Sequence, residues 1–175
     1  MSHPPLIPTL ATERLVLRAP AATDLQTYTD FCISDRSVGV GGPFTAGDAF
    51  HKLSAIIGHW SLRGYGRWMI ADKQTNAPLG IVGPFYPVGW PEPEIAWTVF
   101  KAAEGRGIAY EAAQAARTYV YDTLGWETVI SCTTPDNTRS IALAQRMGAL
   151  RDGSFHSADY GELYVWRHPS RESLG

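Results

Sequence analysis

The chain has 175 residues, of which 45% are hydrophobic and 18% are charged, and its formal net charge at pH 7 is −2. This composition supports a folded domain with a large core, and it lacks the positive charge that draws proteins to nucleic acid or anionic membranes. No run of about 18 apolar residues predicts a membrane span, and the first residues do not form a secretion signal. We therefore expect one cytoplasmic domain over 1–175, with loose ends at 1–12 and 170–175.

The first half of the chain is predicted to contain a strand, two helices and a three-stranded meander. The branched segment 14–18 indicates the strand, and helices are expected at 22–32 and 45–63. The apolar residues that recur at helical spacing in the second helix are Phe50, Leu53, Ile57 and Trp60. The meander strands are expected at 68–72, 79–86 and 94–100. Large apolar groups on both faces of the last segment predict a central strand covered by helices on both sides.

The second half alternates helices and strands. The clearest helix has apolar residues at every fourth position, namely Ile108, Ala112, Ala116, Val120 and Leu124. A strand is expected at 127–133, followed by a helix that Asp136 or Asn137 caps and that ends at Gly148. The remaining strands are expected at 149–155 and 162–167. This order predicts an α/β layered domain with a mixed sheet.

A glycine turn at 104–109 joins the predicted central strand to the clearest helix. Gly105 and Gly107 leave backbone N–H groups uncovered at a helix N-terminus, where the helix dipole favours a pyrophosphate, and Arg106 adds a cation. Two glycines also make an ordinary tight connection, so the turn alone is a weak signal. The Walker and dinucleotide-binding glycine patterns are both absent from the chain.

Metal and covalent catalysis are disfavoured. Cys32 and Cys132 lie far apart in the sequence, without the spacing of a zinc site. The histidines have neither a second ligand at metal spacing nor a Ser or Cys partner in a nucleophile motif. We expect no metal cofactor.

Four motifs in order resemble the GNAT acetyltransferases of the RimJ/RimL type, which are ribosomal-protein N-terminal acetyltransferases. They are the segment 94–99, the segment 105–112, Asn137-x-x-Ser140 and Met147-Gly148. Segments 12–18 and 165–169 are also similar to that group, so the resemblance covers almost the whole chain. It implies a mixed, mostly antiparallel sheet of about six to seven strands, with helices on both faces and splayed central parallel strands.

The resemblance also implies acetyl-coenzyme A as the acyl donor. The expected pyrophosphate contacts are the main-chain amides of Arg106, Gly107, Ile108, Ala109 and Tyr110. The expected contacts of the pantetheine arm are Trp97, Thr98 and Val99, with further contacts from Asn137 and Ser140. The family usually has Gln or Arg where this chain has Glu104, a carboxylate that repels phosphate. Trp97 is equally consistent with packing, and Asn137 with helix capping.

The implied reaction is attack of a primary amine on a thioester within a ternary complex. An alkylammonium has a pKa of roughly 10, so a base must accept its proton, and Glu94 at the start of the central strand is the candidate. The alternative is that Glu94 is an exposed acid at a strand end. Many GNAT enzymes carry a Tyr seven residues after the motif Asn, where this chain has Ala144. Ser140 is the expected replacement, as proton donor to the leaving thiol.

The loops 38–44 and 84–93 are expected to line the acceptor pocket with Phe44, Phe85, Tyr86 and Trp90. Few acids occur there, which disfavours a polycationic acceptor. The acceptor is left open between a protein N-terminus and a small amine. Two alternatives to an active enzyme are a catalytically inactive GNAT-fold module that binds acyl-coenzyme A or a protein, and an unrelated α/β phosphate-binding protein. The resemblance is also compatible with a homodimer.

Overall fold

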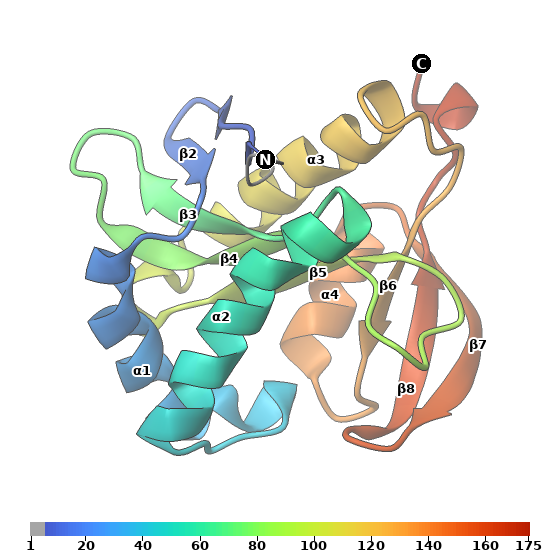
Figure 1. The fold of residues 1–175 in the computed structure, drawn as a ribbon. Helices are drawn as coiled ribbons and strands as arrows, with labels where there is room; N and C mark the ends of the chain where they lie inside the picture. The colour runs from blue at the N-terminus through green and yellow to red at the C-terminus, as the bar shows by residue number, and fades with distance from the viewer. Residues whose placement is uncertain (1–5) are drawn as a thin grey trace.

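The computed structural model describes residues 6–175 and places the strands of that range in one eight-stranded sheet, in the order β1-β2-β3-β4-β5-β6-β8-β7 (Figure 1). The strands are β1 (Leu10–Ala11), β2 (Leu15–Arg18), β3 (Trp68–Asp72), β4 (Pro78–Phe85), β5 (Glu94–Val99), β6 (Ile130–Thr133), β7 (Leu150–Ser157) and β8 (Gly161–Arg167). The helices are α1 (Leu25–Ile33), α2 (Ala46–Arg63), α3 (Ile108–Asp122) and α4 (Thr138–Arg146). Short 3₁₀ turns are η1 (Ala22–Asp24), η2 (Asp35–Val40), η3 (Lys101–Ala103) and η4 (Glu172–Leu174).

The predicted mixed, mostly antiparallel sheet with helices on both faces is confirmed, but it has eight strands rather than six to seven. The additional strand is β1, which pairs with β2 inside the segment expected to be loose. Part of the expected loose end 1–12 therefore belongs to the sheet, and residues 1–5 lie outside the described range. None of the helices in the described range is long and apolar enough to cross a membrane.

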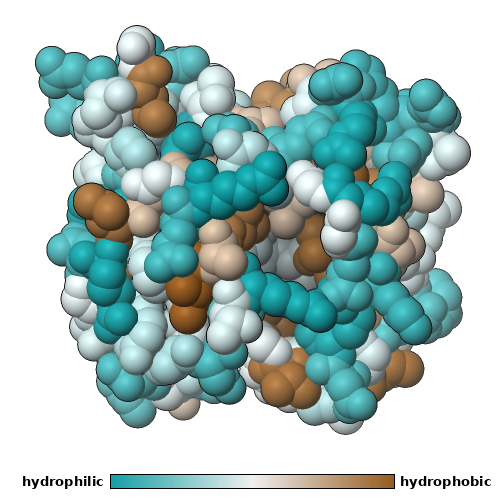
Figure 2. All heavy atoms as spheres, turned by 180° about the vertical axis from the view of Figure 1, so that it is seen from behind, coloured by the Kyte–Doolittle hydropathy of each residue, from teal (hydrophilic) through white to brown (hydrophobic). Residues whose placement is uncertain are grey.

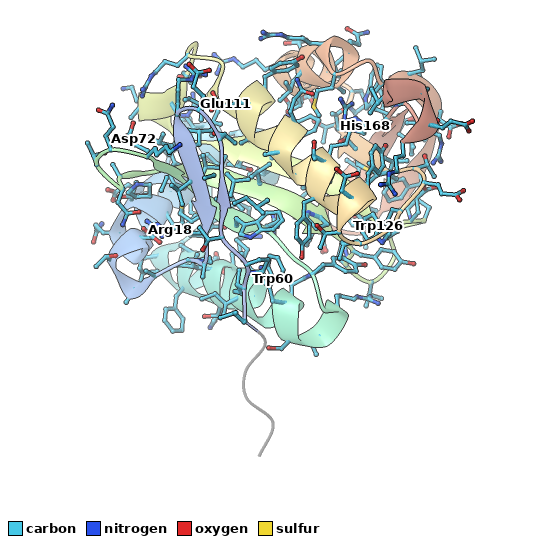
Figure 3. The ribbon with its side chains drawn as sticks, turned by 90° about the horizontal axis from the view of Figure 1, so that it is seen from above. Arg18, Trp60, Asp72, Glu111, Trp126 and His168 are labelled. Atoms are coloured by element: carbon cyan, nitrogen blue, oxygen red, sulfur yellow. The ribbon has the colours of Figure 1, made fainter. Side chains whose placement is uncertain are left out.

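The two faces of the sheet carry different helices (Figure 1). On one face α3 packs against β4 and β5, and its buried residues join Leu17 and Ile70 in the larger core cluster. On the other face α1 and α2 pack together over Met69 and Ile81. Glu111 ties the start of α3 to the β1–β2 turn, because its carboxylate accepts from the side chains of Thr12 and Arg14 (Figure 3).

The buried face of α2 differs from the predicted one. Leu53 and Trp60 are buried as expected, but Phe50 is 56% exposed and Ile57 is 43% exposed. Ala49 and Ile56 take their places in the core. Each of these two residues follows another apolar residue, and spacing alone does not show which of the two is buried; the helix packs residues 49, 53, 56 and 60 against the sheet.

The central strands diverge at the position that matters for the site. β5 pairs antiparallel with β4 along its whole length, from Phe85–Glu94 to Gly80–Val99. With β6 it is parallel and has one registered pair, Glu94 with Ile130. The backbone of β5 beyond Glu94 is therefore not used by a β6 ladder, which is the splayed arrangement that the resemblance implied.

Candidate active site

The N-terminus of α3 differs from those of α2 and α4 in how it is capped. Thr45 caps α2 and Asn137 caps α4 through side-chain oxygens, whereas α3 starts at Gly107, which has no side chain to cap it. Gly107 adopts φ 74° and ψ 10°, a left-handed conformation that favours glycine. No described side chain therefore caps the first-turn amides of α3, which leaves the predicted anion site sterically possible.

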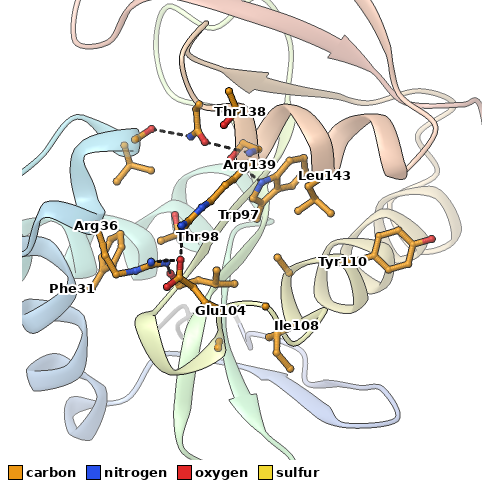
Figure 4. Close-up of a pocket in the computed structure, with 18 of the residues that line it drawn as sticks. Phe31, Arg36, Trp97, Thr98, Glu104, Ile108, Tyr110, Thr138, Arg139 and Leu143 are labelled. Atoms are coloured by element: carbon orange, nitrogen blue, oxygen red, sulfur yellow. Dashed lines mark hydrogen bonds and ion pairs between the residues drawn. The ribbon is translucent and has the colours of Figure 1, made fainter.

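These amides open onto a cleft of about 1050 Å³ (Figure 4). Figure 2, which shows the face opposite to Figure 1, has a central hollow with largely hydrophobic walls and a hydrophilic rim. The predicted cofactor residues that line the cleft are Trp97, Thr98, Val99, Gly107, Ile108, Ala109, Tyr110, Asn137 and Ser140. Arg106 does not line it, because its guanidinium turns back and donates to the carbonyl of Ala102. The cation that the sequence placed beside the turn is therefore not supplied by the Arg106 side chain.

Three other arginines line this cleft, namely Arg36, Arg139 and Arg146, and the first two offset a carboxylate there. Arg36 from η2 and Arg139 from α4 both form ion pairs with Oε1 of Glu104, as the dashed lines of Figure 4 show. These contacts lower the pKa of Glu104, with the hydrogen bond from Arg36 as the largest cause. Two guanidinium groups thus offset the carboxylate that the sequence marked as a potential phosphate repellent. Arg36 also donates to the carbonyl of Val99 over 3.1 Å.

Asn137 caps α4, and Ser140 lies in the first turn of α4 beside Trp97 of β5. Asn137 Oδ1 accepts from the Ser140 amide at 3.2 Å, which is the predicted cap, and its Nδ2 donates to the Gly39 carbonyl at 3.4 Å. Ser140 Oγ accepts from Trp97 Nε1 at 3.3 Å. Within the described residues the Ser140 hydroxyl has no acceptor of its own, so its proton remains available to a ligand in the cleft.

A second cavity of about 500 Å³ adjoins the first. The residues that line both cavities are Phe31, Gly39, Val40, Trp97, Thr98, Asn137 and Ser140. The four predicted acceptor residues, Phe44, Phe85, Tyr86 and Trp90, all line the second cavity. Trp90 packs edge-on against Phe85, Phe155 and Tyr160, with ring centroids 5.4 to 5.9 Å apart. The structure therefore brings together an aromatic pocket and an anion-binding cleft that meet at β5 and α4.

Glu94 lies in the wall of the second cavity and is only 5% exposed, so it is not the exposed strand-end acid of the alternative interpretation. Trp90 Nε1 donates to its Oε1 at 2.9 Å, and the Cys132 amide donates to its Oε2 at 2.7 Å. Burial raises the pKa of Glu94 to about 7, and these two donors limit the rise. A carboxyl group that titrates near neutral pH is suited to general-base chemistry.

A buried chain of hydrogen bonds supports β5 directly beside Glu94. Arg117 on α3 donates to His168 Nδ1 at 3.3 Å, His168 Nε2 contacts Ser131 Oγ at 2.9 Å, and Ser131 donates to the Ile95 carbonyl at 2.7 Å. Arginine is only a donor, so Nδ1 accepts and His168 carries its proton on Nε2. Figure 3 shows His168 on the far side of α3 from Glu111.

We expect replacement of His168 by Gln to alter the pH dependence of stability. Burial, together with the charge of Arg117, lowers the pKa of His168 to about 3. Below about pH 6.5 the imidazole of the unfolded chain is protonated, whereas His168 in the folded state stays neutral. The free energy of unfolding therefore decreases as the pH falls. At pH 4.5 this loss is about 2 to 3 kcal/mol. In urea unfolding, the stability advantage of wild type over His168→Gln should shrink by that amount between pH 7.5 and 4.5; a constant difference would contradict it.

Several residues of the site were not found from the sequence. Arg139 lies between Asn137 and Ser140, so its position within that motif could have predicted a cation at the cleft. Arg67 directly precedes β3, whose first four residues are all buried, and a charge at the entrance of such a strand was a usable signal. Arg36 reaches the cleft from η2, a turn that the sequence did not predict. Tyr160, from the turn between β7 and β8, also lines the second cavity.

His59 also lines the second cavity, but both of its ring nitrogens are engaged. Nδ1 contacts the Tyr65 carbonyl at 2.7 Å, and Nε2 accepts from the Tyr86 amide at 3.0 Å. Burial lowers the pKa of His59, which favours this neutral form. His59 therefore fastens α2 to the end of β4 and is not free to act as a base. Among the described residues no group of three or more His, Cys, Asp or Glu is arranged to hold a metal ion.

Comparison with known proteins identifies related domains. A family model of the acetyltransferase (GNAT) domain matches residues 14–150. An acetyltransferase from Agrobacterium tumefaciens strain C58 is 38% identical, with 93% of this chain and 94% of that chain covered and a TM-score of 0.85. A putative ribosomal-protein-serine acetyltransferase from Vibrio cholerae (19% identity, 91% and 95% covered, TM-score 0.73) shares the fold. RimL, the ribosomal L7/L12 α-N-protein acetyltransferase, in complex with coenzyme A also shares the fold. It is 17% identical, with 90% of this chain and 95% of that chain covered and a TM-score of 0.71.

Proposed function

This chain belongs to the GNAT acetyltransferase family, and on that premise we propose that it transfers the acetyl group of acetyl-coenzyme A to a primary amine by direct attack in a ternary complex. The observation that carries the proposal is the junction of the two cavities. One cavity contains the uncapped N-terminus of α3, the other contains Glu94, and Trp97, Thr98 and Ser140 line both. A donor in the first cavity and an amine in the second would meet at these residues.

The residues of the larger cleft fit coenzyme A. The main-chain amides of 107–110 would hold its pyrophosphate, because the start of α3 is left without a side-chain cap and these residues line the cleft. The backbone of 97–99, beyond the point where β5 and β6 part, would hold the pantetheine arm. Acetyl-coenzyme A supplies a thioester, whose acyl carbon bonds to the amine nitrogen as the carbon–sulfur bond breaks.

Glu94 and Ser140 would handle the protons on the two sides of this step. Glu94 would accept a proton from the incoming ammonium, either directly or through water, because its raised pKa suits that transfer near neutral pH. Ser140 would donate its free hydroxyl hydrogen toward the departing sulfur, which has an ordinary thiol pKa of roughly 8.5 and needs little assistance. Trp97 would hold Ser140 in place through the existing hydrogen bond.

The test of this proposal is release of free thiol from acetyl-coenzyme A in the presence of a panel of amines, alongside calorimetric titration with acetyl-coenzyme A and coenzyme A. We expect tight binding and amine-dependent thiol release. Binding without release from any amine would favour the non-catalytic acyl-coenzyme A module. No binding by the folded protein would overturn the proposal.

Replacement of Ser140 by Ala is expected to lower kcat by about tenfold to a hundredfold, because the leaving sulfur loses its donor. The affinity for acetyl-coenzyme A should change little, since main-chain groups provide most of the proposed contacts. Steady-state kinetics and calorimetry measure the two quantities separately. Ser54→Ala is the matched control, because Ser54 is an exposed helical serine that hydrogen-bonds only to the Phe50 carbonyl. Unchanged turnover in Ser140→Ala would remove Ser140 from the mechanism.

A further inference from the structure

Among the described residues, Arg67 is the one buried or half-buried arginine whose side chain has no hydrogen-bond or ion-pair partner. The other arginines that are buried or half-buried all have such partners: Arg18 has Asp24, Arg36 has Glu104, Arg117 has Met147 and Arg167 has Glu92. The guanidinium of Arg67 lies over the ring of Phe85, 4.1 Å from its centroid, and lines the second cavity. Its donors thus face space that a ligand can enter, and withdrawing a charge from water without a partner is costly.

The second cavity is positively charged although the chain as a whole is slightly negative. Its ionic lining residues are Lys52, Arg63, Arg67 and one carboxylate, Glu94. Lys52 and Arg63 rest on the rings of Phe44 and Tyr86, and neither forms an ion pair with a described residue. An uncharged or cationic acceptor would leave this excess of positive charge uncompensated, whereas an anionic group on the acceptor would neutralise it.

Arg67 and Glu94 line the same cavity but do not pair with each other. Glu94 is already oriented by Trp90 and the Cys132 amide, so it does not turn to the guanidinium. Tyr28 and Tyr160 stand near Arg67, and burial raises the pKa of both, so both remain neutral hydrogen-bonding groups. His59 has no free ring nitrogen. The cavity therefore offers one carboxylate, Glu94, a half-buried guanidinium without a polar partner, Arg67, and aromatic side chains that contact both.

We propose that the acceptor amine also carries a carboxylate, which Arg67 binds while the amine faces Glu94. The apolar part of the acceptor then packs against the aromatic residues that line the cavity. This inference rests on the proposed acetyl transfer and narrows its acceptor to molecules of the amino-acid class. A guanidinium fork matches a carboxylate with two parallel hydrogen bonds, and its plane is already held by Phe85. A cavity of about 500 Å³ falls within the range of small-molecule sites.

The experiment compares matched amines that differ only in the carboxylate. Phenylalanine, tyrosine and leucine are each paired with the decarboxylated amine and with the amino-acid amide, which also stands for a protein N-terminus. We expect kcat/KM to be at least about tenfold higher for the carboxylated member of a pair. Arg67→Met should remove that preference. Arg63→Met removes a charge at the exposed rim of the same cavity and should keep the preference.

Calorimetric binding of the same compounds, without acetyl-coenzyme A, separates this inference from the proposed function. Carboxylate-dependent binding that Arg67→Met abolishes would support the inference even if no acetyl transfer occurred. Acetyl transfer with equal or better use of the decarboxylated amines or the amides by wild type would overturn it while leaving the proposed function intact. The wild-type comparison needs no variant, so it decides the question even if Arg67→Met does not fold. An equal loss of preference in Arg63→Met would show a general charge effect and overturn the direct contact.

Discussion

Replacement of Glu94 by Gln is expected to lower kcat by about 100-fold or more, because the amide keeps the shape of the carboxyl group but cannot accept the ammonium proton. The Gln amide has a single acceptor oxygen, so it can accept from Trp90 Nε1 or from the Cys132 amide but not from both, and circular dichroism must first show that the variant is folded. Glu92→Gln is the matched control. Glu92 lies two residues away, pairs with Arg167 and does not line the acceptor cavity. Its removal should leave kcat within about twofold.

The pH profile gives a second readout for Glu94. Its pKa is about 7, so below pH 7 it is increasingly protonated and unable to act as a base. The amine acceptor also loses its proton only as the pH rises toward roughly 10. Because ionised Glu94 takes its proton from the bound ammonium, log kcat/KM of the wild type on total amine should rise with a slope of about one below pH 7 and level off between pH 7 and roughly 10. Glu94→Gln should show a slope of about one throughout. A variant with near-wild-type turnover and an unchanged profile would exclude Glu94 as the base.

The order of elements could be predicted from the sequence because most of them carry strong local signals. The β3 to β5 meander and α3 have regular apolar spacing and clear glycine or proline stops, and the structure places them within a few residues of the predicted bounds. The two-residue strand β1 was missed because it is defined by its pairing with β2 rather than by its own residues. Phe50 and Ile57 show the related error, since spacing predicts a helix more reliably than it predicts which of two adjacent apolar residues is buried.

The candidate site was predictable to the extent that it follows local motifs. The glycine turn, Asn137 and Ser140 lie within recognisable patterns, and the structure gathers them around one cleft. Arg36 and Arg67 come from single positions whose meaning depends on tertiary placement, and no spacing rule selects them. Arg106 is the reverse case: its position in the turn suggested a phosphate-facing cation, but the Ala102 carbonyl accepts from its side chain instead. The direction in which a single arginine side chain points is thus the feature of such a site that the sequence predicts least well.

Replacement of Gly107 by Glu is expected to weaken acetyl-coenzyme A binding by at least about 100-fold. The new carboxylate would stand at the uncapped N-terminus of α3, where it would occupy the amides and repel the pyrophosphate. A Cβ at this position meets only Arg14 Nη2 at 3.5 Å, an ordinary contact, so the first atom of a side chain can be accommodated. The left-handed backbone, with φ 74°, adds strain of about 1 to 2 kcal/mol for any residue other than glycine.

Gly107→Ala separates these two effects, because it introduces the same backbone strain without the charge. Calorimetric titration of both variants with acetyl-coenzyme A, on samples shown to be folded by circular dichroism, should give a modest loss for Ala and a severe loss for Glu. Equal losses would mean that backbone geometry at the turn, rather than charge, controls binding. Wild-type affinity in a folded Gly107→Glu variant would place the pyrophosphate elsewhere, and the open amides of α3 would then lose their proposed role.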